Sequence, residues 1–357
     1  MVDAIFDLLP PLLRTLDAVM WAQRNLHPPV AGRLAERLTA ESDAIAAPLA
    51  TMQAVECPEE LRFMRERLVE VAGETTGLVA AFAEAAGTSG DFVGLYRALR
   101  RASRVQEALY PLAPAFDPIS RWFLEPARRG DDALVAALRD AALRDDVRAG
   151  VMHASNERTD RGGFSLYVPE TWDGRAAMPL VVALHGGHGH GRDFLWTWLR
   201  EARARGVLVA APTSRDRTWS MMGEDVDAPL LSAVIDAVAQ RYPIDRARVL
   251  LTGMSDGATY GLLAGLADGS PFTHLAPLCG VLHPFLFANG GLARVKERPV
   301  YLAHGALDWM FPVDVARQAH AVLVEAGAQC VYREIADLSH TYPRDENPAI
   351  LDWLLRA

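Results

Sequence analysis

The chain has 357 residues, a formal net charge of −9 and 50% hydrophobic residues. This length favours two domains over one, and the composition supplies enough apolar residues for a sizeable core. The acidic balance argues against a nucleic-acid surface and gives no sign of attraction to an anionic membrane. No uncharged apolar run reaches the roughly 18 residues of a membrane span, and residues 1–16 lack the basic flank of a signal peptide. The expected location is therefore cytoplasmic, without a membrane span.

The cysteine content indicates a reducing compartment. The three cysteines, Cys57, Cys279 and Cys330, lie far apart and have no metal-ligand spacing. Cys279 and Cys330 fall in apolar runs that are typical of strands. Buried thiols are therefore favoured over a disulfide.

Residues 1–148 are predicted to form a helical domain, because apolar residues recur at helical spacing and glycine is sparse. Pro58, followed by two glutamates, is typical of a helix start. The sets that form single apolar faces are Leu61, Met64, Leu68 and Val71; Leu95, Leu99, Ala102 and Leu109; and Leu134, Ala137, Leu138 and Ala141. Breaks near residues 27–29, 87–90 and 111–118 indicate about five or six helices in residues 1–145. These apolar faces leave open a homo-oligomer formed through the helices.

Residues 149–357 alternate between strand and helix patterns. Strands are expected at residues 164–168, 179–184, 206–210, 248–251, 274–279, 299–303 and 330–335. Helices are expected at residues 230–238, 258–266, 313–326 and 348–356. Such alternation predicts an α/β domain with a mostly parallel sheet covered by helices on both faces. Ligands should then bind beyond the carboxyl ends of the strands.

The most informative motif is Gly253-Met254-Ser255-Asp256-Gly257, which follows the apolar run ending at Leu251. A serine hydroxyl is a poor nucleophile unless it is exposed beside a base. A strand that breaks at Gly253 and restarts as a helix after Ser255 presents the hydroxyl on a sharp turn, and the two glycines let the neighbouring elements pass close. Ser255 is therefore the candidate nucleophile. The alternative is a surface loop with a coincidental match.

The candidate acid and base follow later strands. Asp308 lies in the loop after the strand at 299–303, and His340 lies between the last strand and the terminal helix. The order Ser255, Asp308, His340 is that of nucleophile, acid and base in α/β-hydrolases. In such an arrangement the histidine takes the serine proton and the acid fixes the histidine tautomer. Asp337 is the alternative acid, because it also follows a strand.

The segment His185–Gly191 follows the strand at 179–184 and contains alternating glycines. These glycines permit a backbone N–H to point into the site, so the N–H groups of Gly187 and Asp256 are the predicted oxyanion donors. A metal cluster of His185, His188 and His190 is an alternative, but no carboxylate or cysteine lies at metal-ligand spacing. We expect no metal.

Several residues are candidates for substrate contacts. His188 lies in the glycine-rich segment, Trp219 lies in the loop after the strand at 206–210, and Trp309 adjoins Asp308. Each aromatic is more often part of a core than of a pocket.

Four motifs carry a family resemblance: Leu184–Gly187, Gly253–Gly257, His304–Asp308 and Ser339-His340. Residues from about 160 to 357 resemble the α/β-hydrolase superfamily, in particular its phospholipase/carboxylesterase-type and polyhydroxybutyrate-depolymerase-like esterases. The resemblance implies ester hydrolysis through a covalent acyl-serine, with no cofactor. The helical domain lies outside this pattern, and little chain is left before Asp308 for a large lid. We therefore assign substrate control to the N-terminal helices as a hypothesis.

The resulting hypothesis is a serine carboxylesterase, with a catalytic domain at residues 149–357, that acts on a small-molecule or lipid-like ester. Nucleic acid is not expected as a partner. A triad does not choose the leaving group, so a thioesterase or serine peptidase on the same scaffold is an alternative. A catalytically silent binding protein is the alternative from a different class.

Overall fold

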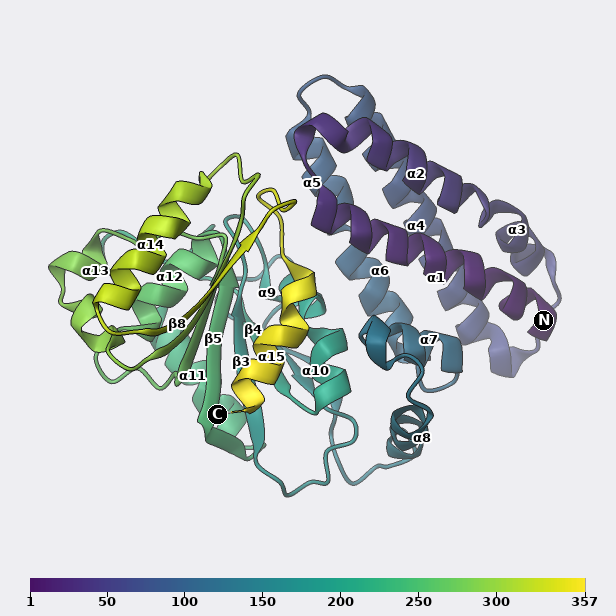
Figure 1. The fold of residues 1–357 in the computed structure, drawn as a ribbon. Coiled ribbons are helices and arrows are strands. Elements are labelled where there is room, and N and C mark those ends of the chain that lie inside the picture. The colour runs from purple at the N-terminus through teal and green to yellow at the C-terminus, as the bar shows by residue number, and fades with distance from the viewer. Residues whose placement is uncertain (357) are drawn as a thin grey trace. The chain divides into compact units, whose positions relative to one another are not determined.

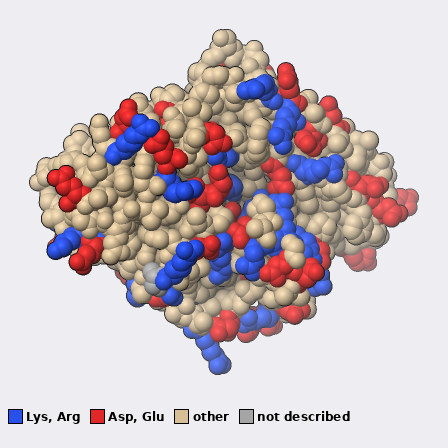
Figure 2. All heavy atoms as spheres, viewed as in Figure 1, with Lys and Arg blue, Asp and Glu red and all other residues tan. Residues whose placement is uncertain are grey.

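A computed structural model describes residues 1–356 and divides the chain into two compact units, Met1–Arg139 and the part from Asp140 onward (Figure 1). The predicted domain boundary at 148/149 lies between helix α8 (Asp132–Ala141) and strand β1 (Gly150–Ala154). Basic and acidic side chains are interspersed on the face that Figure 2 shows. Among the described residues, no helix combines the length and apolarity needed to cross a bilayer.

Helices alone build the first unit. Within the described residues 1–145 there are eight α-helices, more than the five or six expected. They are α1 (Val2–Asn25), α2 (Ala31–Asp43), α3 (Ala46–Ala54), α4 (Arg62–Gly87), α5 (Phe92–Arg100), α6 (Ala102–Leu109), α7 (Asp117–Trp122) and α8.

The apolar stripe from Leu95 to Leu109 was expected to be one helix, and this prediction is wrong. The chain breaks at Arg101, whose guanidinium donates to the Gly77 carbonyl oxygen at 3.2 Å and to Glu74 at 3.0 Å. A break held by a long-range contact leaves no proline or glycine signal in the sequence.

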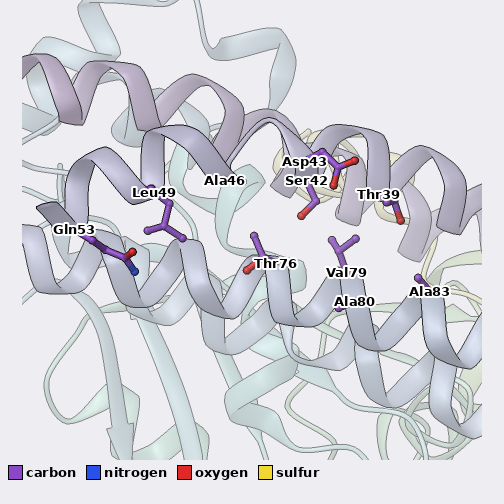
Figure 3. Close-up of a pocket in the computed structure, with 11 residues that line it drawn as sticks. Thr39, Ser42, Asp43, Ala46, Leu49, Gln53, Thr76, Val79, Ala80 and Ala83 are labelled. Carbon is purple, nitrogen blue, oxygen red and sulfur yellow. The ribbon is translucent and has the colours of Figure 1, made fainter.

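A hollow of about 530 Å³ lies among α2, α3 and α4 (Figure 3). Its walls combine small apolar side chains, such as Ala46, Ala80 and Ala83, with polar ones, such as Ser42 and Thr76. The rest of the interface between these helices is filled by fully buried residues, among them Leu38, Leu78 and Phe82.

The second unit is built on an eight-stranded sheet in the order β1-β2-β4-β3-β5-β6-β7-β8. The strands from β4 to β8 in this order run parallel, and only the β1–β2 and β2–β4 pairs are antiparallel. The remaining bounds are β2 (Phe164–Val168), β3 (Met178–Leu184), β4 (Leu208–Pro212), β5 (Ile244–Met254), β6 (His274–Leu278), β7 (Pro299–Gly305) and β8 (Gln329–Ile335). The predicted α/β class and mostly parallel sheet are confirmed.

Two local predictions need correction. Strand β1 was not predicted, because its residues are mostly half-buried and form no apolar run. Strand β4 begins at Leu208 rather than at Gly206, because Gly206 has a φ of +69° and ends helix α10 (Leu199–Arg205). A left-handed glycine at this position is a common helix terminator.

Helices pack on the sheet of the second unit on both sides. Figure 1 shows α15 (Asn347–Leu355) in front of the strands and α12 (Asp256–Gly265) behind them. The other helices are α9 (Gly191–Phe194), α11 (Ala228–Ala239), α13 (Phe285–Ala288) and α14 (Val313–Glu325). The core between the layers includes Leu180, Val182 and Leu251, which are buried.

Two glycines allow β5, α12 and β3 to approach closely. A side chain at Gly253 would meet the carbonyl group of Gly257, with 2.5 Å between the added carbon and the oxygen. A side chain at Gly257 would overlap the carbonyl oxygens of Leu184 and His185. The start of α12 is therefore held directly against the end of β3.

We predict that Gly257→Ala destabilises the protein by about 1–3 kcal/mol, because the added methyl meets backbone that cannot rotate away. Gly261→Ala, on the same helix, is the matched control: its nearest neighbours, in Leu184 and Leu251, lie 3.8 Å from the added carbon. That substitution should be neutral or stabilising by up to about 1 kcal/mol. Urea unfolding followed by circular dichroism measures both, and equal stabilities would contradict the packing argument.

Candidate active site

Ser255 occupies the turn between β5 and α12. Its φ is +56° and its ψ is −119°, a conformation that costs a non-glycine residue about 1–3 kcal/mol. The turn is held because the Ser255 N–H donates to the Leu278 carbonyl oxygen at 3.0 Å, while its own carbonyl oxygen accepts from Ala258 and Thr259. The strand, sharp turn and helix expected around the motif are thus present.

The imidazole of His340 lies between Ser255 and Asp308. Its Nε2 is 3.1 Å from Ser255 Oγ, and its Nδ1 is 2.8 Å from Asp308 Oδ2. His340 comes from the loop after β8, Asp308 from the loop after β7, and Ser255 from the end of β5. The structure therefore brings together three predicted residues that are far apart in the sequence. The exposed fractions of all three are below one tenth.

The carboxylate of Asp308 is held by the backbone of its own loop. Its Oδ1 accepts the N–H groups of Met310 at 2.9 Å and Phe311 at 2.8 Å, which turns Oδ2 toward His340. Burial raises the pKa of Asp308, but the hydrogen bonds from His340 and the Phe311 N–H outweigh burial and hold the pKa below its usual value. Asp308 is therefore an ionised acceptor at neutral pH.

A second imidazole approaches the same carboxylate. His304 Nε2 lies 2.8 Å from the Phe311 carbonyl oxygen and 3.4 Å from Asp308 Oδ2. Cys279, His304 and Asp308 are all buried, and within residues 1–356 they form the cluster whose ligand atoms are close enough to hold a metal, within 4.8 Å of one another. Asp308 Oδ2 already accepts from His340 in this arrangement.

The alternative metal cluster of His185, His188 and His190 is not formed. The Ser214 N–H donates to His185 Nε2 at 3.1 Å, and His190 Nε2 bonds the Asp160 carbonyl oxygen at 3.0 Å. His188 is exposed. The rings of His185 and His190 therefore hold different parts of the surrounding backbone.

The glycine-rich loop lies beside the nucleophile. A side-chain carbon built on Gly186 would lie 3.6 Å from Ser255 Cβ, and one on Gly187 would lie 2.6 Å from Asp256 Oδ2. Asp256 is the first residue of α12, so its N–H has no acceptor within the helix. Gly187 thus adjoins Asp256, which directly follows Ser255 in the chain.

The structure corrects the interpretation of Trp219. Its side chain is only 2% exposed, stacks on Tyr260 with ring centroids 5.5 Å apart, and donates through Nε1 to the His185 carbonyl oxygen at 2.7 Å. It belongs to the core and holds the loop from behind, since a buried indole N–H usually has a hydrogen-bond partner.

Two residues of the same loop were missed. Thr218 Oγ1 donates to Asp256 Oδ2 at 2.6 Å. The buried Asp227 carboxylate accepts from the N–H groups of Arg215 and Ser220 and from Ser220 Oγ, at 2.8–2.9 Å. A threonine and an aspartate in a polar loop form no recognisable motif. The one available signal was that this loop follows β4, at the edge of the sheet where ligands are expected.

Exposed side chains flank Asp308. Trp309 is 47% exposed, and its neighbours Leu307 and Met310 are 44% and 46% exposed. These three apolar side chains form a rim next to the buried acid. His188, the other predicted contact residue, has a φ of +56° and donates its N–H to the Arg217 carbonyl oxygen at 2.8 Å.

Residues 223–355 match the model of the phospholipase/carboxylesterase family, and this segment contains Ser255, Asp308 and His340. A curated relative, the bifunctional acetylxylan esterase/xylanase XynS20E of Neocallimastix patriciarum, is 27% identical over 174 residues, which is 48% of this chain and 25% of the relative. The chain therefore spans about a quarter of that relative's length.

Solved structures with similar folds include a thermostable esterase, which is 21% identical with a TM-score of 0.47. The match covers 62% of that esterase and 58% of this chain. Esterase PE8 is 25% identical with a TM-score of 0.44, and the match covers 97% of it and 53% of this chain. The unit from Asp140 onward is therefore an α/β domain with a mostly parallel sheet, and its residues 223–355 are similar to the phospholipase/carboxylesterase family.

Proposed function

We propose that the protein is a serine carboxylesterase that works through an acyl-serine intermediate. The observation that carries the proposal is the His340 imidazole, hydrogen-bonded on one side to the Ser255 hydroxyl and on the other to Asp308. This is the arrangement that converts a serine hydroxyl into a nucleophile.

In the first half of the reaction, His340 Nε2 takes the proton of Ser255 as the oxygen attacks the ester carbonyl carbon. Asp308 holds Nδ1–H, so that the free nitrogen faces the serine, and stabilises the imidazolium that forms. His340 then passes the proton to the leaving alcohol. In the second half, water attacks the acyl-serine, with His340 again as base, and releases the acid and Ser255.

The developing oxyanion needs hydrogen-bond donors. We assign the N–H groups of Gly187 and Asp256 to this role, because Gly187 lies against Asp256 and the N–H of Asp256 points from the first turn of α12, directly after Ser255. Losing one such donor typically raises the barrier by about 2.7–4 kcal/mol.

The apolar rim of Leu307, Trp309 and Met310 supports a hydrophobic acyl or alcohol group. Exposed apolar side chains that gather beside a reactive centre are typical of substrate surfaces. We therefore propose a small-molecule or lipid-like ester as substrate. The triad is also compatible with thioesters and amides, and the tests below separate these.

We predict that Ser255→Ala abolishes both hydrolysis of para-nitrophenyl esters and labelling by a fluorophosphonate. The loss in kcat should be at least about 10⁴-fold, because no other residue supplies the nucleophile. Thr259→Ser, one turn along α12, is a control that keeps a hydroxyl nearby. Labelling that survives Ser255→Ala would contradict the assignment, and turnover of thioesters or amides without ester turnover would contradict the substrate class.

Asp308→Asn should lower kcat by about 10³–10⁴-fold, because the amide favours the wrong histidine tautomer. Its effect on stability should depend on pH. The lowered pKa means that ionised Asp308 stabilises the native state fully above the unfolded-state pKa of about 3.9, and that this contribution is lost as pH falls through the native pKa.

The difference in unfolding free energy between wild type and Asp308→Asn should therefore be largest near neutral pH and shrink below about pH 4. Urea titrations at a series of pH values measure it. A difference that grows on acidification would show that Asp308 is not held in its charged form.

For the helical unit we propose control of the substrate range. Deleting residues 1–139 should broaden or shift the preference across a series of para-nitrophenyl esters of increasing acyl length. A folded, active truncation with an unchanged preference would reject this role.

A further inference from the structure

A second hollow, of about 250 Å³, lies at the carboxyl edge of the sheet. It is lined by Arg161, His188, Arg215, Asp216 and Arg217. Its residues come from the loops that follow β1, β3 and β4. Three guanidinium groups therefore gather around a space with one carboxylate.

Two hydrogen bonds link this basic hollow to the proposed active site. His188 directly follows Gly187, and its N–H donates to the Arg217 carbonyl oxygen at 2.8 Å. Thr218, next to Arg217, donates to the carboxylate of Asp256, which directly follows Ser255. Two short links therefore connect the hollow to the oxyanion loop and to the nucleophile turn.

The charges in the hollow are not balanced. Asp216 Oδ1 accepts the Arg217 backbone N–H at 2.7 Å. Within residues 1–356, no ion pair is found for the Arg215 or Arg217 guanidinium, and both side chains are exposed. Uncompensated positive charge is notable on a chain whose net charge is −9, because it marks the place where an anion is attracted.

The loop that carries these arginines is held in place. Arg161 donates to the Gly189 carbonyl oxygen at 2.8 Å and to Ser214 Oγ at 2.7 Å. From the other side, the Asp227 carboxylate binds the N–H of Arg215. A site whose backbone is ordered before binding loses less entropy when a ligand arrives.

We propose that this hollow binds an anionic group, a carboxylate, carried by the ester substrate. Its volume is below the roughly 300–1,000 Å³ of pockets that hold a whole small molecule, so it fits one substituent of the substrate. Guanidinium groups bind carboxylates in a bidentate fashion. The inference rests on the proposed function and narrows it to esters with a charged end.

The test compares esters that differ by one charge. The acyl-side pair is the para-nitrophenyl monoester of adipic acid and para-nitrophenyl hexanoate; the alcohol-side pair is para-acetoxybenzoate and phenyl acetate. For the pair whose charge enters the hollow, Arg217→Ala should lower the anionic-to-neutral ratio of kcat/KM about two- to fivefold relative to wild type, the size expected for one exposed ion pair. The double variant Arg215→Ala/Arg217→Ala should lower it about tenfold or more.

Arg246→Ala is the matched control, because Arg246 is also exposed but lies near the amino end of β5, away from Ser255. It should leave both ratios unchanged. Added salt should weaken the preference for the anionic ester in wild type and not in the double variant.

The outcomes separate the two proposals. If neutral esters are hydrolysed and the arginine variants change neither ratio, the anionic subsite is overturned while the esterase stands. If no ester is hydrolysed and Ser255 is not labelled by a fluorophosphonate, the proposed function fails and the subsite fails with it. Thermal unfolding confirms that each variant is folded.

Discussion

The close approach of Gly257 to the carbonyl groups of Leu184 and His185 is the constraint on which the rest of the site depends. It fixes the start of α12 against the end of β3, and thereby sets Ser255 beside the glycine-rich loop. Ser255 adopts a left-handed φ of +56° at a cost of about 1–3 kcal/mol. Its hydrogen bond to Leu278, on the neighbouring strand β6, helps to hold that conformation.

The distances around Asp308 show which of two neighbouring imidazoles its carboxylate binds. Asp308 Oδ2 is 2.8 Å from His340 Nδ1 but 3.4 Å from His304 Nε2, and His304 instead bonds the Phe311 carbonyl oxygen at 2.8 Å. The carboxylate is therefore engaged chiefly with one imidazole. Because two backbone N–H groups bind its other oxygen, Asp308 stays ionised although it is buried.

The sequence predicted those features that depend on local pattern. Ser255, Asp308 and His340 each follow a strand of the parallel sheet. Because parallel strands end at the same edge of a sheet, the three residues were expected to lie near one another. Features that depend on tertiary contacts were not predictable. The half-buried strand β1 has no apolar run. At the break near Arg101, the contact is to Gly77, 24 positions away. Trp219 is buried and donates a hydrogen bond to the His185 carbonyl oxygen, whereas a substrate contact was expected.

The proposed chemistry and the proposed selectivity are assigned to different loops of the same sheet edge. The loops after β5, β7 and β8 supply Ser255, Asp308 and His340, whereas the loop after β4 supplies Arg215, Arg217 and Thr218. The contact from Thr218 to Asp256 joins the two sets one residue beyond the nucleophile. Among the described residues, no hydrogen bond or ion pair joins Arg215 or Arg217 to Ser255, Asp308 or His340. The charge of the hollow can therefore change while the hydrogen bonds of His340 stay as they are. Under the proposed function, changes in the β4 loop would alter which ester binds, while the residues assigned to the reaction stay the same.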